Sequence, residues 1–433
     1  MSAQTVKCIW YFDVKHYIIK AMRTENLLKI AIVNSEFSSA VETAHGGIAT
    51  YSDTLAYYLS TKGHTVHYFS RNTPPPPGEL NSNLIYHQYG FSPPSSFTFL
   101  LLHYLFPKSY HWELGHARTL SRLLNNLIDN NNIDIVEFPE YAGLAYYYRK
   151  KHRVPYIVTF HTPSILVDKL NLTEPTTSQR FRYRMEEATI ASADGFKSPS
   201  NTLKKYMSDN YAIDEQSIQH IRNPIKFEIS DHITPASLDH KRFDILFSGR
   251  FEYRKGAGII LRAIKKILEI APEITFSIAG ATEFSSAENY RHALERSLSP
   301  DERKRVWFLG PLSYEHLLPL YRNSSVFLFP SLFENAPYSL FEAMSSGMPI
   351  IASDTGGVPE VITHKENGLL FSPDKPDDLV NHIRTLYTDR QLAQKLGNNA
   401  AKSIRSLLDA ESLINEHIQF YQAVLERFRK THS

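Results

Sequence analysis

The chain has 433 residues, of which 42% are hydrophobic and 21% are charged, and this length suits two globular domains. A formal net charge of only +2 gives no indication of a nucleic-acid-binding protein, and a single cysteine, Cys8, excludes a disulfide framework and a cysteine-based zinc site. No apolar stretch approaches the roughly 20 residues that a membrane-spanning helix needs.

The first segment, residues 1–27, is predicted to be an N-terminal extension. It carries Asp13 and lysines among its apolar residues and has no small-residue cleavage site, so it is a poor signal peptide. A second methionine, Met22, precedes the first convincing strand, so residues 1–21 need not be translated.

Residues 28–226 are predicted to form a first domain in which strands and helices alternate. Residues 27–35 are a continuous apolar run, which is typical of a strand buried on both faces. A glycine-rich turn with Gly46 and Gly47 follows, and then a helix over 49–62. Residues 140–152 are predicted to form another helix. The further strands are predicted at 65–71, 133–139, 155–161, 195–200 and 218–224.

After a polar connector that ends near residue 241, the pattern starts again and predicts a second domain at 227–405. Its strands are predicted at 243–250, 274–280, 306–310, 326–331, 349–353 and 367–371. Such alternation indicates parallel sheets, so we expect two doubly wound domains that bind ligand in the cleft between them. Residues 406–433 are predicted to form a helix that packs back toward the first domain.

Two glutamates, Glu334 and Glu342, flank the proposed start of a helix in the second domain. We expect Asn335 to cap this helix, because Pro337 is tolerated only in a first turn. The helix would then present free backbone amides as an anion site suited to phosphate. These amides belong to Tyr338, Ser339 and Leu340. On spacing alone, two ordinary solvated glutamates would be the better explanation.

A basic loop, 248–258, follows the first strand of the second domain and supplies Arg250, Arg254 and Lys255. Its glycine and lysine spacing is not that of a P-loop. Since it lies at the same sheet edge as Glu334, the two features together favour a diphosphate ligand over a plain surface loop.

The first domain offers weaker signals at the same cleft. Gly46 and Gly47 would let a ligand approach the backbone, but they do not form the GxGxxG pattern of a nicotinamide cofactor. His161 ends a predicted strand, a position that suits a binding role as well as a structural one. We expect neither a cofactor nor a metal, because the chain has no HExxH motif and no Asp-x-Asp pair.

With these residues in place, the sequence resembles the retaining GT-B glycosyltransferases of family 4, from Leu28 to the C-terminus. The resemblance is most specific over 329–371, where the two glutamates precede Gly347-Met-Pro, Gly356-Gly357 and Asn367-Gly368. Two departures occur near the expected donor: Ala336-Pro337 replace a common glycine, and 222–227 lack the usual Gly and Asp. Donor base, sugar, acceptor and linkage therefore stay open.

The resemblance implies a hexosyltransferase of polysaccharide biosynthesis, acting on a glycan or lipid-linked glycan with retention of configuration and without a metal. It implies that Arg250 and Lys255 hold the donor diphosphate, Glu342 the ribose and Glu334 the transferred sugar. His161 and the Gly46-Gly47 loop would complete the donor pocket. Alternatives are another GT-B enzyme, such as an epimerase or phosphorylase, and a non-catalytic nucleotide- or glycan-binding module.

The expected location is the cytoplasm. The apolar segment 91–106 falls in the acceptor-binding domain of this family and could contact the inner face of a membrane. A loop followed by a core helix explains the same segment more simply.

Overall fold

The computed structural model describes residues 27–35, 46–71, 81–90, 109–130, 132–150, 152–226, 242–282 and 290–432. Residues 1–26 of the expected extension, the apolar segment 91–106 and most of the connector before residue 241 lie outside this part. None of the helices in the described ranges has the length and hydropathy of a transmembrane span.

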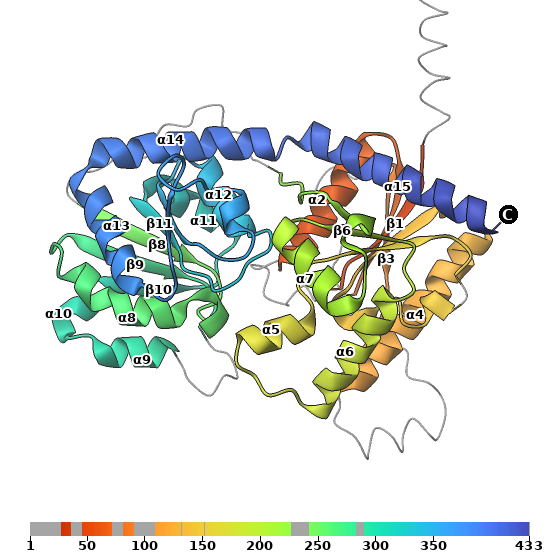
Figure 1. The fold of residues 1–433 in the computed structure, drawn as a ribbon, viewed down its shortest axis with the longest axis horizontal. Helices are drawn as coiled ribbons and strands as arrows, with labels where there is room; N and C mark the ends of the chain where they lie inside the picture. Colours follow the sequence, from red (N-terminus) through yellow and green to blue (C-terminus); the bar gives the residue numbers. More distant parts are fainter. Residues whose placement is uncertain are drawn as a thin grey trace, which may run out of the picture.

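Two α/β domains lie side by side, each built on one parallel sheet (Figure 1). The first sheet has the strand order β3-β2-β1-β4-β5-β6-β7 and the second has the order β10-β9-β8-β11-β12-β13. In both, the order reverses beside the first strand, between β1 and β4 and between β8 and β11. This confirms the predicted doubly wound, Rossmann-like architecture of the GT-B fold.

The strands of the first sheet are β1 (Lys29–Val33), β2 (Thr65–Ser70), β3 (Leu84–Gln88), β4 (Ile135–Pro139), β5 (Tyr156–Thr159), β6 (Gly195–Ser198) and β7 (Ile218–His220). Those of the second are β8 (Phe243–Ser248), β9 (Ile274–Ala279), β10 (Val306–Gly310), β11 (Val326–Phe329), β12 (Ile350–Ser353) and β13 (Leu369–Phe371). Strand β3, which is only partly buried, was not predicted from the sequence.

The helices of the first domain are α2 (Gly47–Thr61), α4 (Ser109–Asp129), α5 (Ser164–Leu170), α6 (Thr177–Ile190) and α7 (Asn201–Tyr211). The second domain contains α8 (Ala257–Leu268), α9 (Tyr290–Ser297), α10 (Pro300–Arg303), α11 (Tyr314–Asn323), α12 (Tyr338–Ser345), α13 (Pro376–Thr388) and α14 (Arg390–Leu407). Short 3-10 turns are η1 (Tyr141–Gly143), η2 (Tyr148–Lys150), η3 (Glu215–Ser217), η4 (Tyr253–Lys255) and η5 (Val358–Glu360).

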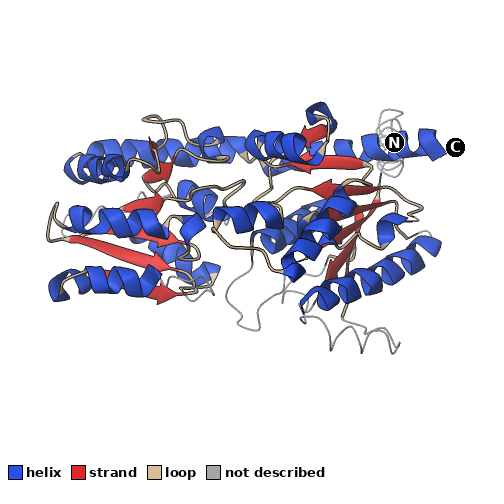
Figure 2. Cartoon of the chain, turned by 60° about the horizontal axis from the view of Figure 1, so that its bottom comes forward, coloured by secondary structure: helices blue, strands red, loops and turns tan. Residues whose placement is uncertain are grey.

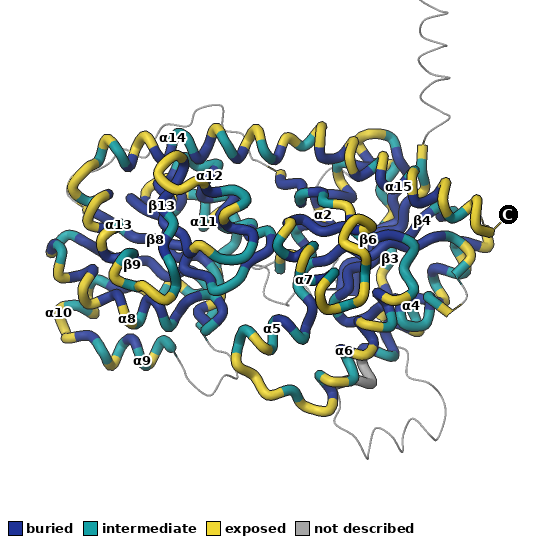
Figure 3. Tube along the Cα trace, viewed as in Figure 1, coloured by how far each residue is buried: buried dark blue, intermediate teal, exposed yellow. Residues whose placement is uncertain are grey.

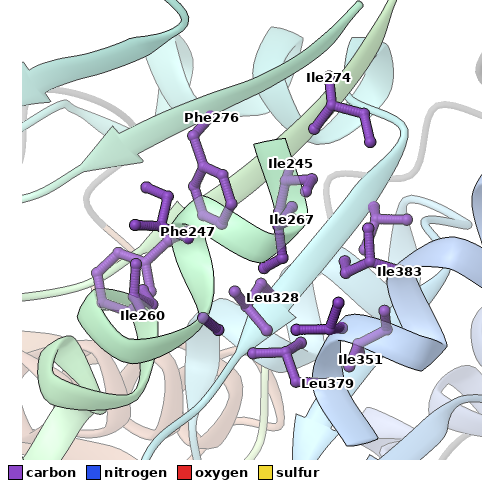
Figure 4. Packing of buried hydrophobic residues seen from close by; sticks show 14 of the residues in the cluster. Ile245, Phe247, Ile260, Ile267, Ile274, Phe276, Leu328, Ile351, Leu379 and Ile383 are labelled. Atoms are coloured by element: carbon purple, nitrogen blue, oxygen red, sulfur yellow. The ribbon is translucent and has the colours of Figure 1, made fainter. Parts of the chain in front are cut away.

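Most strands are buried because helices cover the faces of each sheet, whereas the edge strands β3 and β10 are partly exposed (Figures 2 and 3). In the second domain, Ile260 and Ile267 of α8 and Ile383 of α13 pack with the apolar side chains of β8, β9 and β11 (Figure 4). β11 is accordingly a continuous apolar run, whereas in β9 the apolar residues Ile274, Phe276 and Ile278 of this core alternate with Thr275 and Ser277.

The last helix, α15 (Ala410–His432), returns from the second domain and lies along the first (Figure 1). Its apolar side chains share one core with β1 and α2: Ile414, Phe420 and Val424 pack with residues such as Ile30 and Leu55. The C-terminal segment therefore connects the two domains physically.

The helix predicted over 140–152 is wrong. The backbone instead forms η1 and η2, because Ala142 and Gly143 both have positive φ, 64° and 58°. A Cβ at Gly143 would lie 2.6 Å from the backbone carbon of Met185, so this turn is pressed tightly against α6. A local helical pattern cannot reveal that contact.

Candidate functional site

The candidate site lies where the order of the second sheet reverses. Strands β8 and β11 pair in parallel, so the loops that leave their carboxyl ends are neighbours. The first loop carries the predicted cations, and the second carries Glu334.

Gly256, between η4 and α8, allows these loops to touch. Its φ is 85°, and a Cβ there would lie 2.0 Å from the carbonyl oxygen of Pro330 in the loop after β11. Only glycine fits, because any side chain would meet backbone. The turn thereby holds Lys255 beside the segment that leads to Glu334.

Glu334 is buried and bound by two cations. Its Oε1 atom lies 2.5 Å from Lys255 Nζ and 2.8 Å from the Nη1 atom of Arg254. Burial by itself would raise the pKa of Glu334, but the charges of Lys255 and Arg254 outweigh it and lower the pKa. Burial lowers the pKa of Lys255, against the opposing effect of Glu334. The lowered pKa of Glu334 keeps its carboxylate ionised near neutral pH.

Arg250 joins the same cluster from the solvent side. One of its guanidinium nitrogens lies 3.2 Å from Glu252 Oε1, which is also 3.3 Å from Arg254. Among the described residues, three cations thus meet two carboxylates in this cluster. The sequence points to Arg254 as a cation of this loop without assigning it a role, and Glu252 of the same loop was not predicted to be a site residue.

The predicted cap of α12 is wrong. Pro337, not Asn335, occupies the N-cap position, and no side chain caps the helix there. Asn335 instead donates from Nδ2 to the carbonyl oxygen of His161 at 2.9 Å. The Leu340 amide was predicted to be free, but it donates to the Pro337 carbonyl oxygen at 3.1 Å. The Leu340 side chain lies in the hydrophobic core.

Glu342 lies within α12 and contacts a different partner. Its Oε2 accepts a hydrogen bond of 3.0 Å from the Tyr321 hydroxyl. Burial raises the pKa of Glu342 to about 7, and this hydrogen bond opposes the shift only in part. Glu342 therefore titrates near neutral pH, unlike Glu334.

The first domain faces α12 through the start of α2. A Cβ placed on Gly47 would lie 4.0 Å from the ring of Tyr338, the first residue of α12. The Tyr338 hydroxyl donates to the Pro224 oxygen at 3.4 Å. The Gly46-Gly47 turn and the start of α12 are therefore neighbours, as a shared binding site requires.

His161 follows β5 at the domain interface. Its ring lies against Tyr51, with ring centroids 5.1 Å apart. Removal of water from the ring lowers the pKa of His161 to about 4, and Glu137 opposes this shift. The imidazole is thus neutral at pH 7 and can exchange hydrogen bonds, but it adds no charge.

The structure therefore brings Arg250, Lys255 and Glu334 into one cluster and connects His161 to it through Asn335. Sequence reasoning missed this role of Asn335, since a short polar residue before proline suggests a helix cap. No group of three or more His, Cys, Asp or Glu within the described residues is arranged to hold a metal ion.

Comparison with known proteins agrees with this fold. Residues 45–228 match the family profile "Glycosyltransferase Family 4", and residues 229–403 match "Glycosyl transferases group 1". An uncharacterized glycosyltransferase of Methanocaldococcus jannaschii is 24% identical over 412 residues, which are 92% of this chain and 99% of the relative. A D-inositol 3-phosphate glycosyltransferase of Corynebacterium glutamicum is 23% identical over 59% of this chain and 63% of its own length.

Solved structures share the fold over nearly the whole chain. Sucrose-phosphate synthase from Thermosynechococcus elongatus has a TM-score of 0.73 and 20% identity, over 92% of this chain and 99% of the other. The Anabaena protein HepE has a TM-score of 0.65 and 17% identity, over 93% of this chain and 100% of the other.

Proposed function

Given that this chain is a glycosyltransferase of the GT-B type, we propose that it transfers a hexosyl unit from a nucleotide-diphosphate sugar to a glycan or lipid-linked glycan, with retention of anomeric configuration. The observation that carries this proposal is the contact of Lys255 and Arg254 with Glu334 where the sheet order reverses. At this point Lys255 and Arg254, which could bind a diphosphate, lie next to Glu334, whose carboxylate could accept hydrogen bonds from sugar hydroxyls.

The donor would lie against the second domain. Arg250 and Lys255 would hold the diphosphate, and Glu342 would accept hydrogen bonds from the ribose. Of the amides first considered at the start of α12, those of Tyr338 and Ser339 are the ones that would face the phosphates. The structure of the Anabaena protein with UDP-glucose supports a nucleotide sugar as donor.

In the reaction, the bond between the sugar C1 and the diphosphate oxygen would break, and a bond from C1 to the acceptor oxygen would form on the same face. The acceptor proton would pass to a leaving diphosphate oxygen. Lys255 and Arg250 would stabilise the negative charge that develops on the diphosphate, so this mechanism calls for neither a cofactor nor a metal ion.

Glu334 and His161 would act on the sugar from the two domains. Since Lys255 contacts Glu334, an incoming diphosphate would share this lysine. Glu334 would then accept from a sugar hydroxyl, while neutral His161 would hydrogen-bond to another without repelling a developing cation.

The acceptor would bind at the first domain. We expect a cytoplasmic enzyme whose glycan or lipid-linked acceptor comes from solution or from the inner face of a membrane.

The test is a panel of nucleotide sugars, assayed by thermal stabilisation, donor turnover and the anomeric configuration of the product. We expect Lys255→Ala to weaken nucleoside diphosphate binding about 10- to 100-fold, because it removes a charged contact. We expect Glu334→Gln to lower kcat about 100-fold while nucleotide binding changes little.

Normal diphosphate affinity in Lys255→Ala would refute the diphosphate assignment. Equal losses of binding and turnover in Glu334→Gln would argue against a role at the sugar. Binding without any turnover of a donor would favour a non-catalytic module, and an inverted product would exclude the retaining mechanism.

A further inference from the structure

We infer that Asn335 is a positioning residue for the transfer reaction, because its side chain joins the main chain of His161 in the first domain to the segment that carries Glu334 in the second. The inference rests on the proposed function. It concerns the relative placement of the two side chains expected to meet at the sugar.

Both ends of the Asn335 amide are used, and its orientation is determined. The Nδ2 group donates to the His161 carbonyl oxygen at 2.9 Å, which a carbonyl in the same place could not do. The Ser200 hydroxyl donates to Oδ1, while Ser200 Oγ accepts from the Leu203 amide at 3.2 Å. Asn335 is buried, so these contacts are shielded from water.

His161 is held from its other side by Glu140. This buried carboxylate accepts from the His161 amide at 2.8 Å and from the Thr162 amide at 2.7 Å. The His161 carbonyl oxygen accepts from two side chains, the hydroxyl of its neighbour Thr162 and the Asn335 amide. Of the side chains that bind the His161 main chain, Glu140 and Thr162 lie in the same domain as His161, whereas Asn335 ties it to the opposite domain. The position of His161 relative to the second domain therefore depends on Asn335.

Gly357 allows the Asn335 segment to lie in close contact with the neighbouring loop. The Gly357 amide donates to the Glu334 oxygen at 2.7 Å. A Cβ at Gly357 would lie 2.4 Å from the main-chain carbonyl oxygen of Asn335 and 3.1 Å from Ser200 Cβ. Three segments from two domains therefore meet with no room for a side chain.

The same loop ends at Glu360, which strengthens the contact between the domains. Its carboxylate accepts from the backbone amides of Asn201 at 3.0 Å and Thr202 at 2.9 Å, in the first turn of α7. A carboxylate is favoured at the N-terminus of a helix. Glu360 thus holds α7, and with it Ser200, in the position that lets Asn335 reach His161.

Loss of the Asn335 contact should affect turnover and nucleotide affinity differently. Lys255 contacts Glu334 and Glu342 contacts Tyr321, so the bond from Asn335 to His161 does not place the groups that would hold the diphosphate and the ribose. Transfer needs His161 and Glu334 correctly placed around one sugar, and small displacements are costly at such a centre. Loss of the Asn335 contact should therefore lower turnover far more than nucleotide affinity.

Two variants separate positioning from packing. Asn335→Ala removes both hydrogen bonds, whereas Asn335→Asp keeps the volume and the oxygen that Ser200 needs but lacks the donor to His161. We expect kcat to fall about 10- to 100-fold in both, with nucleoside diphosphate affinity within about threefold of wild type. Asn210→Ala, at an exposed position on α7, is the matched control and should retain wild-type kcat.

The NMR signal of the His161 imidazole provides a measurement that does not depend on turnover. In protein labelled at its 19 histidines, the His161 ring signal can be assigned by its loss in His161→Gln. We expect this signal to shift or broaden in Asn335→Ala and Asn335→Asp, and to stay unchanged in Asn210→Ala.

Wild-type kcat in Asn335→Asp, or an unchanged His161 signal in both Asn335 variants, would overturn the inference. If wild type turned over none of the nucleotide sugars, the proposed function would fail. The histidine signal would then still decide whether Asn335 positions His161.

Discussion

Glu334 and Glu342 are the same residue type, with seven residues between them, and yet their carboxylates differ in chemistry. Cations surround Glu334 and lower its pKa, whereas Glu342 has a tyrosine hydroxyl as its hydrogen-bond partner, and burial raises its pKa to about 7. We infer that Glu334 is ionised at every physiological pH, while Glu342 changes its charge within that range.

Affinity for the nucleotide sugar should therefore depend on pH through Glu342. An ionised carboxylate accepts ribose hydrogen bonds better than a protonated one. With a pKa of about 7, the ionised fraction rises from about one tenth at pH 6 to about nine tenths at pH 8. We expect affinity to rise by up to about ninefold over that range, measured by calorimetry with an intact nucleotide sugar, whose phosphates do not titrate there.

Glu342→Gln is the control, because it keeps the side-chain shape and every other titrating group. Its affinity should be lower at pH 8 and nearly constant from pH 6 to 8. The same pH dependence in this variant would assign the effect to another residue.

At the scale of elements, the turn between β8 and α8 decides whether the cations reach Glu334. Gly256 combines a φ of 85° with contact to the Pro330 backbone, so Ala there should distort the turn. Gly310 is a matched control, because its φ is 70° but nothing lies within 4 Å of a Cβ there.

We expect Gly310→Ala to cost roughly 1 kcal/mol in the free energy of unfolding, the cost of the left-handed conformation alone. Gly256→Ala should cost clearly more and should also weaken diphosphate binding. Chemical denaturation and calorimetry measure the two effects. Equal costs for the two variants would show that close contact at Pro330 does not constrain the turn.

At the scale of the whole molecule, a buried polar cluster attaches α15 to the first domain. Lys197 of β6 lies 2.8 Å from Glu137 Oε2 on β4 and 2.8 Å from His417 Nδ1 on α15. Tyr421 of α15 also donates to Glu137 Oε2, and Tyr51 donates to Oε1 at 2.7 Å. Burial lowers the pKa of Lys197 to about 8, against the opposing charge of Glu137. The pair is thus ionised at neutral pH.

Removal of one charge should leave the other buried and uncompensated. We expect Lys197→Met to lower the free energy of unfolding by about 3–5 kcal/mol and to loosen α15. Denaturant unfolding and limited proteolysis near residue 410 would measure this. Lys197→Met with Glu137→Gln should recover part of the loss, because no buried charge remains.

Lys205→Met is the surface control, since the Lys205–Asp209 ion pair is exposed, and we expect no measurable change in stability. A small effect of Lys197→Met, similar to that of Lys205→Met, would mean that apolar packing alone holds α15 in place.

Much of the fold and part of the site could be predicted because they depend on local pattern. Apolar runs such as those of β1 and β11 indicate buried parallel strands, and the loops after such strands must meet at one sheet edge. These two rules together predict that Lys255 lies near Glu334, and the two side chains are in contact. The edge strand β3 was not predicted because it is only partly buried. Its sequence therefore includes the polar residues His87 and Gln88 and is not a continuous apolar run.

The sequence by itself determined the alternation of strands and helices, and with it two parallel sheets and the loops that carry charge. Only the tertiary structure decided the partners of Asn335 and Glu137: His161 lies 174 positions from Asn335, and Tyr421 lies 284 positions from Glu137. The physical reason is that periodicity reports which face of an element is buried. A hydrogen bond between distant segments depends instead on how whole domains pack.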